Sequence, residues 1–212
     1  MANDLEIIKR LEKETGERLE KVEFNERGYC QEGYVVDEEN RVVGLNLSEK
    51  ESTKIPHEIS KLSHLIVLML WGNNIVDISP IKELRNLKIL FLIMNQISDI
   101  SVLKDLSNLT KLNLSYNQIS DISVLKSLSN LTLLDLSRNK ISDISVLKDL
   151  SNLTKLYLSN NQISDISKVV GDRPEFAFQN LMDEMRRIWE ILNSSGEGEE
   201  SNLEGEFIGL GF

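Results

Sequence analysis

Leucine and isoleucine recur through the middle of the chain with a fixed spacing of 22 residues. Residues 106–127 and 150–171 are identical at 16 of 22 positions. Self-similarity at this period predicts an array of stacked units, in which each unit covers the core of its neighbours. One 23-residue unit comes first, and the pattern then starts anew at Leu62, Leu84, Leu106, Leu128 and Leu150.

Within one unit, apolar and polar residues alternate over a short stretch, which predicts a strand. Leu112 and Leu114 are expected to point into the core, and the residues on either side of them to point outward. Equivalent strands of successive units would then pair side by side in a parallel sheet. The other apolar positions of this unit are also expected to be buried: Leu106, Leu109, Ile119, Ile122 and Leu125.

The motif L-x-x-L-x-x-L-x-L-x-x-N-x-I of residues 106–119 resembles the leucine-rich repeat, in the short class found in internalins and phosphatase regulatory subunits. The resemblance covers about residues 39–170. It implies an α/β fold, a right-handed solenoid of six repeats with a concave parallel β-sheet, short 3-10 turns on the convex side and helical caps. It also implies a protein-interaction module or adaptor that binds a protein or peptide on its concave face. Similar arrays precede GTPase domains in Roco-type proteins and ligase domains in bacterial effectors. The alternative is therefore the recognition part of a larger enzyme system.

Two polar columns follow the strands at the same 22-residue spacing. The asparagines are Asn73, Asn95, Asn117, Asn139 and Asn161, and the aspartates are Asp77, Asp99, Asp121, Asp143 and Asp165. In the leucine-rich-repeat family, the asparagines hydrogen-bond backbone groups that the turn would otherwise bury without partners. The aspartates are expected to cap the start of a 3-10 turn. A metal ladder is the weaker interpretation, because metal sites need several oxygens that converge on one point.

Both ends of a solenoid must be capped, and we predict that residues 1–38 form the first cap. The residues Leu5, Ile7, Ile8 and Leu11 have helical spacing between Asn3, a residue that favours helix starts, and Gly16, a helix stop. The stretches 34–36 and 42–43 predict a hairpin that leads into the first repeat. Residues 28–45 are similar to the N-terminal cap of plant-type leucine-rich repeats, although that cap usually carries two cysteines and this chain has only Cys30.

After the repeats, residues 171–193 predict a C-terminal helical cap, with an amphipathic helix offered to a partner as the alternative. Its apolar face would consist of Phe178, Leu181, Met182, Met185, Ile188, Trp189 and Leu192. Residues 194–212 form an acidic tail that ends in apolar residues. That tail either stays solvated, extends the cap, or docks onto the concave face of its own molecule or of a neighbour.

The net charge of −10 argues against nucleic acid or a membrane surface as the partner, since both need a basic footprint. Residues 171–212 hold ten acidic residues against three arginines, so most of the negative charge lies outside the repeats. Neither a secretory leader nor an apolar run of about 20 residues is evident. The single cysteine suits a reducing compartment, and a cytoplasmic location is expected.

Motifs for catalysis are missing from the sequence. Neither a phosphate-binding Gly-x4-Gly-Lys loop nor a Gly-x-Ser-x-Gly elbow is present. His57 and His64 are seven residues apart, whereas a zinc-protease helix needs a spacing of four. Cys30 has no evident histidine partner and is interpreted as a structural thiol. We therefore predict a protein that is not an enzyme and uses no cofactor or metal.

The outward strand residues that differ between units are the candidate partner-binding residues. They are Val67, Met69, Trp71, Ile89, Phe91, Ile93, Lys111, Asn113, Leu133, Asp135, Lys155 and Tyr157. The first six are large and apolar, and together they predict an exposed patch of a size that is often functional. Three interpretations of the patch stay open at this point: a foreign protein or peptide binds it, another part of the chain covers it, or it has no role.

Overall fold

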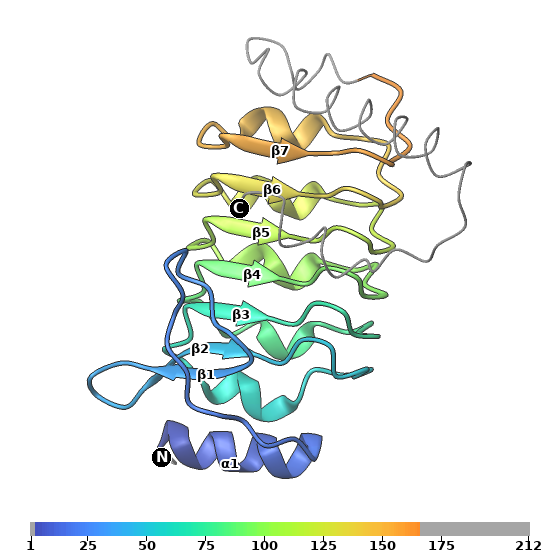
Figure 1. Cartoon of the computed structure of the whole chain (residues 1–212). Helices are drawn as coiled ribbons and strands as arrows, with labels where there is room; N and C mark the ends of the chain where they lie inside the picture. Colours follow the sequence, from blue (N-terminus) through green and yellow to red (C-terminus); the bar gives the residue numbers. More distant parts are fainter. Residues whose placement is uncertain (1–2, 166–212) are drawn as a thin grey trace, which may run out of the picture.

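A computed structural model of the chain describes residues 3–165 as a row of stacked units behind one sheet (Figure 1). The helix α1 spans Asp4–Thr15. The strands are β1 (Gly33–Val36), β2 (Val42–Asn46), β3 (Val67–Met69), β4 (Ile89–Phe91), β5 (Lys111–Asn113), β6 (Leu133–Asp135) and β7 (Lys155–Tyr157). Five 3-10 helices lie behind them: η1 (His57–Lys61), η2 (Ser79–Ile81), η3 (Ser101–Asp105), η4 (Ser123–Ser127) and η5 (Ser145–Asp149). The predicted α/β solenoid is confirmed.

The sheet runs in chain order from β1 to β7. Strands β2–β7 are parallel, and β1 adds to β2 as an antiparallel hairpin partner. The register sets each middle leucine beside the next, for example Leu90 beside Leu112 and Leu112 beside Leu134. All three are completely buried, so adjacent units share one continuous apolar core.

The asparagine column is a ladder of backbone contacts. Asn117 Nδ2 donates to the carbonyl oxygens of Leu92 and Leu114 at 2.8 and 3.1 Å, while its Oδ1 accepts from Ile97 N at 3.0 Å. Asn95 and Asn139 repeat this arrangement one unit earlier and one unit later. The amides therefore satisfy turn groups of the preceding unit that are buried away from water. The structural prediction for this column is confirmed.

The aspartate column caps the 3-10 helices. Asp99 Oδ1 accepts from the backbone N–H of Ser101 at 2.8 Å, and Asp121 does the same with Ser123 at 2.8 Å. These N–H donors lower the pKa of the Asp99 and Asp121 carboxyls, because they stabilise the ionised form. The aspartates thus accept from the first backbone N–H of η2–η5, as predicted, although the N-cap residue of each helix is the isoleucine that follows the aspartate.

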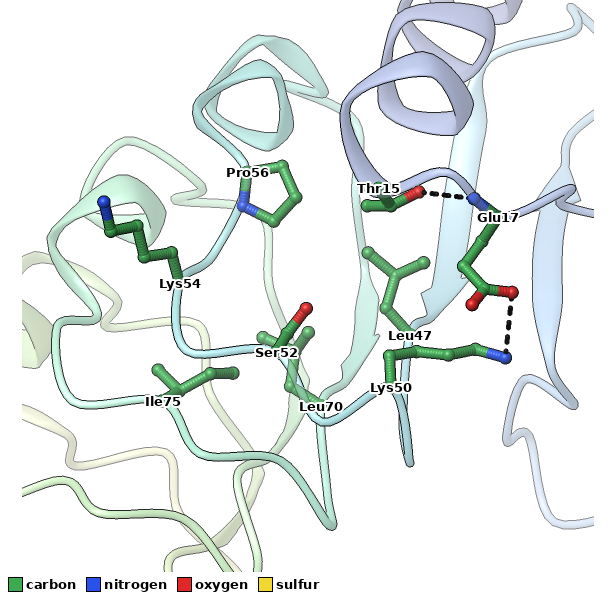
Figure 2. A pocket seen from close by; sticks show the side chains of 9 residues that line it. All are labelled: Thr15, Glu17, Leu47, Lys50, Ser52, Lys54, Pro56, Leu70 and Ile75. Atoms are coloured by element: carbon green, nitrogen blue, oxygen red, sulfur yellow. Dashed lines mark hydrogen bonds and ion pairs between the residues drawn. The ribbon is translucent and has the colours of Figure 1, made fainter.

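The N-terminal helix α1 begins and ends at the predicted residues. Asn3 Oδ1 accepts from Glu6 N to start α1, and Gly16 ends it in the left-handed conformation. The helix lies across the first unit, where Asp4 accepts from the backbone N–H of Val42 at 2.8 Å. Lys50, which takes the place of the ladder asparagine in the first unit, instead pairs with Glu17 of the cap (Figure 2). It also pairs with Glu32.

The predictions for the C-terminal helix over residues 171–193 and for the tail over residues 194–212 lie outside the described residues. The structure therefore places the repeat strands β2–β7 and one cap.

Candidate interaction surface

The outer face of the sheet is the surface formed by strand side chains that point away from the core. Its N-terminal half is covered by residues 21–31, a loop between α1 and β1 that extends over the sheet and returns to β1 (Figure 1). This covering segment forms a second, small core on the outer face. The buried members of that core include Cys30 and Val67, with Val22, Phe24, Met69 and Ile89 packed against them.

Close approach of the covering segment depends on Gly44 in β2. A side-chain Cβ at this position would lie 2.8 Å from Cε1 of Phe24, which is closer than carbon atoms can pack. A glycine there leaves room for the phenylalanine ring to lie directly on the backbone of the strand.

Tyr29 of the covering segment contacts residues as far along the sheet as β5. Its ring lies 5.3 Å from that of Phe91, centroid to centroid, and the planes are inclined at 58°. Lys111 Nζ sits 4.9 Å from the centroid of the tyrosine ring and donates to its hydroxyl oxygen at 3.4 Å. The loop that presents Tyr29 is closed by Asn25, whose Oδ1 accepts from the backbone N–H groups of Arg27 and Tyr29.

The predicted exposed apolar patch is therefore wrong for four of its six residues. Val67 and Phe91 are buried, and Met69 and Ile89 pack under the covering segment. The chain covers this part of the face itself because Phe24 and Tyr29 supply the matching apolar surface. Trp71 and Ile93, nearer the carboxyl ends of β3 and β4, stay half-exposed.

The half of the outer face over β5–β7 is polar. Lys155 is exposed, and Lys111, Asp135 and Tyr157 are partly exposed. The prediction of accessible side chains is wrong for Asn113 and Leu133, which are both buried. The amide of Asn113 is used internally: Nδ2 donates to Asp135 Oδ2 at 3.2 Å, and Oδ1 accepts from Ser115.

A second column of side chains follows the carboxyl ends of the strands. Met94, Tyr116 and Arg138 occupy equivalent positions with φ values of 53°, 56° and 56°, in the left-handed region. The guanidinium of Arg138 lies 4.6 Å from the centroid of the Tyr116 ring. Sequence reasoning missed this column, although the repeat itself marks it, one residue before each ladder asparagine. The exposed side chains here, with Trp71 and Ile93, form what we call the carboxyl rim.

The single cysteine of the chain, Cys30, is buried. Burial raises the pKa of the Cys30 thiol to about 12, so almost no thiolate exists at neutral pH. Among residues 3–165, no His, Cys, Asp and Glu side chains gather in a group of three that could hold a metal ion. No helix within the same range is long and apolar enough to cross a membrane.

Comparison with protein families gives one clear match. The model described as Leucine Rich repeats (2 copies) matches residues 63–105, 85–127, 107–149 and 129–171. Together these stretches run from residue 63 to residue 171, which is more than half of the chain. A comparison with curated proteins by sequence finds no match.

Solved structures with the same architecture come from bacteria and plants. An internalin (inlF) from Listeria monocytogenes is 36% identical over 65% of this chain and 42% of its own, with a TM-score of 0.59. Internalin C2 from the same organism is 38% identical over 64% and 62% of the two chains, also with a TM-score of 0.59. The receptor kinase GASSHO1/SCHENGEN3 ectodomain of Arabidopsis thaliana, in complex with CASPARIAN STRIP INTEGRITY FACTOR 2, is 29% identical over 65% and 18%, with a TM-score of 0.55. The chain thus spans less than two thirds of either internalin.

Proposed function

This chain belongs to the leucine-rich-repeat family, whose domains are generally protein-interaction modules, and we propose that it acts as a non-catalytic adaptor for a protein or peptide. The proposed contact surface is the open face, which we define as the outer face of β5–β7 together with the carboxyl rim. The part of the outer face that lies under residues 21–31, around Val67, Met69 and Ile89, is left out of this surface, because the covering segment occupies it.

This proposal rests on the positions at which the repeats differ from one another. The ten residues before β5, β6 and β7 (101–110, 123–132 and 145–154) differ from one another only at the fifth position. The outward strand positions that follow change in both size and charge. The first is Lys111, Leu133 or Lys155, and the second is Asn113, Asp135 or Tyr157. A scaffold held constant beneath a varied surface is what a recognition face requires.

The charge of the open face favours an acidic partner. Lys111, Arg138 and Lys155 supply three cations, against the single carboxylate of Asp135 on these strands. Arginine stacked on an aromatic ring is a common element of interface centres, and Arg138 on Tyr116 has this arrangement. The complex of the similar plant ectodomain with its ligand supports a protein or peptide as the class of partner. We also propose a cytoplasmic location, which the free thiol of Cys30 supports.

Charge reversal on the open face is expected to abolish partner capture. The full chain would be used as bait in native lysate, as wild type and as Arg138→Glu with Lys155→Glu. We expect recovery of the wild-type partner to fall roughly tenfold or more, since like charges placed across an interface cost several kcal/mol.

The matched control carries Lys104→Glu with Lys126→Glu, two exposed lysines at equivalent positions of η3 and η4 on the other side of the molecule. It changes the net charge by the same amount and should recover the partner as the wild type does. If the η3 and η4 variant loses the partner while the open-face variant keeps it, the binding surface has been assigned to the wrong side.

A further inference from the structure

One part of the open face remains apolar. Trp71 and Ile93 are partly buried, and Met94 is 38% exposed; among residues 3–165, only Met94 and Val76 are exposed large apolar side chains. The backbone N–H of Gly72 donates to Ile93 O at 2.9 Å, which fixes the ends of β3 and β4 side by side. We call these three side chains the apolar corner. Neither of the two hydrophobic clusters of the structure includes any of them.

The cations of the open face lie on one side of the apolar corner. From β7 back toward β3, successive units carry Lys155, Arg138 and Lys111 before the corner is reached. Lys155 and Lys111 are the first residues of β7 and β5, whereas Arg138 and the corner lie beyond the carboxyl ends of their strands. A ligand that crosses the sheet obliquely, from the start of β7 to the ends of β4 and β3, would therefore meet positive charge first and apolar surface last.

The chain contains one segment with this order of chemistry. Between residues 197 and 206 it has five glutamates and no basic residue: Glu197, Glu199, Glu200, Glu204 and Glu206. Four large apolar side chains follow directly: Phe207, Ile208, Leu210 and Phe212. We infer that residues 197–212 bind the open face of their own molecule, with the glutamates over β7–β5 and the apolar residues on the corner at β4 and β3.

Length and direction agree with this arrangement. β7 is the last strand that the structure describes and lies at the end of the sheet, so the chain enters residues 166–212 from the end that carries Lys155. Four strand spacings of about 4.8 Å separate β7 from β3, which is about 19 Å. A random-coil chain of 16 residues has an average span of about 22 Å. Both halves of the segment can therefore reach their complements at once.

Binding within one molecule has a functional consequence. A tethered segment acts at an effective concentration of about millimolar, so even a weak contact would fill the open face most of the time. An outside partner would then have to displace residues 197–212. This consequence rests on the proposed function, whereas the docking itself requires no outside partner.

The test uses the full chain with Trp189→Phe, which leaves Trp71 as the one tryptophan, since the sequence has two. Acrylamide quenching of its fluorescence reports how far solvent reaches the apolar corner. Phe207→Ser with Phe212→Ser should raise the quenching constant at least twofold without changing the circular dichroism spectrum. Arg138→Glu with Lys155→Glu should raise it as well, because the glutamates lose their counter-charges.

The matched control keeps the amino-acid composition of residues 197–212 and changes only the order of the acidic and apolar blocks. In it, residues 207–212 are moved in front of residues 197–206, so that the apolar block meets the cations. This variant should be quenched like the double serine variant. The inference is overturned if quenching is the same in all variants, or if the reordered segment protects Trp71 as well as the natural one. Protection that appears only as the protein concentration rises would also overturn it, because the segment would then come from a second copy. None of these readouts involves a foreign partner, so failure here leaves the capture experiment unaffected.

Discussion

Replacing Asn117 with alanine is expected to lower the free energy of unfolding by about 2–3 kcal/mol. The amide makes contacts in two adjacent units, and its removal affects them unequally. The carbonyl oxygens of Leu92 and Leu114 keep a second donor, from Asn95 and Asn139 respectively. The backbone N–H of Ile97 loses its acceptor at Asn117 Oδ1 and is left buried without one. Most of the expected loss is the desolvation of that single donor.

Urea unfolding followed by circular dichroism measures this change. Gln118→Ala is the control, since Gln118 is the next residue, is exposed, and accepts one exposed side-chain hydrogen bond from Lys140. It should cost less than about 0.5 kcal/mol. Equal losses for the two variants would show that the asparagine ladder does not hold the units together.

Gly33→Ala is expected to open the N-terminal cap and to lower stability by about 2–4 kcal/mol. Gly33 begins β1 with φ of +121°, a region that other residues avoid. A Cβ there would lie 2.2 Å from the carbonyl oxygen of Glu20. The backbone at Glu20 lies along the outer edge of β1, where Tyr34 N donates to Glu20 O at 2.9 Å. The two backbones would have to separate, and the covering segment begins at this point.

Labelling of Cys30 with a thiol reagent at neutral pH detects cap opening directly. The thiol is 2% exposed and its pKa is raised to about 12 by burial, so it should react only when the covering segment lifts. Gly33→Ala should react many times faster than wild type. Gly16→Ala is the control, because Gly16 also has a positive φ, of +76°, but has open space around it. It should cost about 1 kcal/mol and leave labelling slow. Slow labelling in Gly33→Ala would mean that the cap does not depend on this contact.

The sequence predicted the parts of the fold that repeat or that are local. The strand leucines, the asparagine ladder and the aspartate caps are each determined by residues within one 22-residue unit and its neighbour. The start and stop of α1 at Asn3 and Gly16 are local signals of the same kind. Repetition makes such positions visible, because each is seen five or six times in one chain.

The accessible surface could not be predicted in this way. The covering segment occurs once, and its contacts join residues far apart in sequence, such as Tyr29 with Phe91 and Lys111. Alternation along β3 and β4 showed correctly that Val67 and Phe91 point away from the main core. It contained no information about what lies above them. The hydrogen bond from Asn113 to Asp135 could not be predicted either, because it depends on the direction of a side chain in the neighbouring unit.

Partners are proposed to bind the open face of β5–β7 and not the convex side. Reductive dimethylation of lysines on the full chain, alone and with the captured partner, distinguishes the two surfaces. Lys155 is exposed on the open face, and Lys104 and Lys126 are exposed on the 3-10 side. We predict that the partner protects Lys155 from modification while Lys104 and Lys126 react as fully as in the free protein. Protection of Lys104 and Lys126, with Lys155 still reactive, would show that the partner binds the convex side instead.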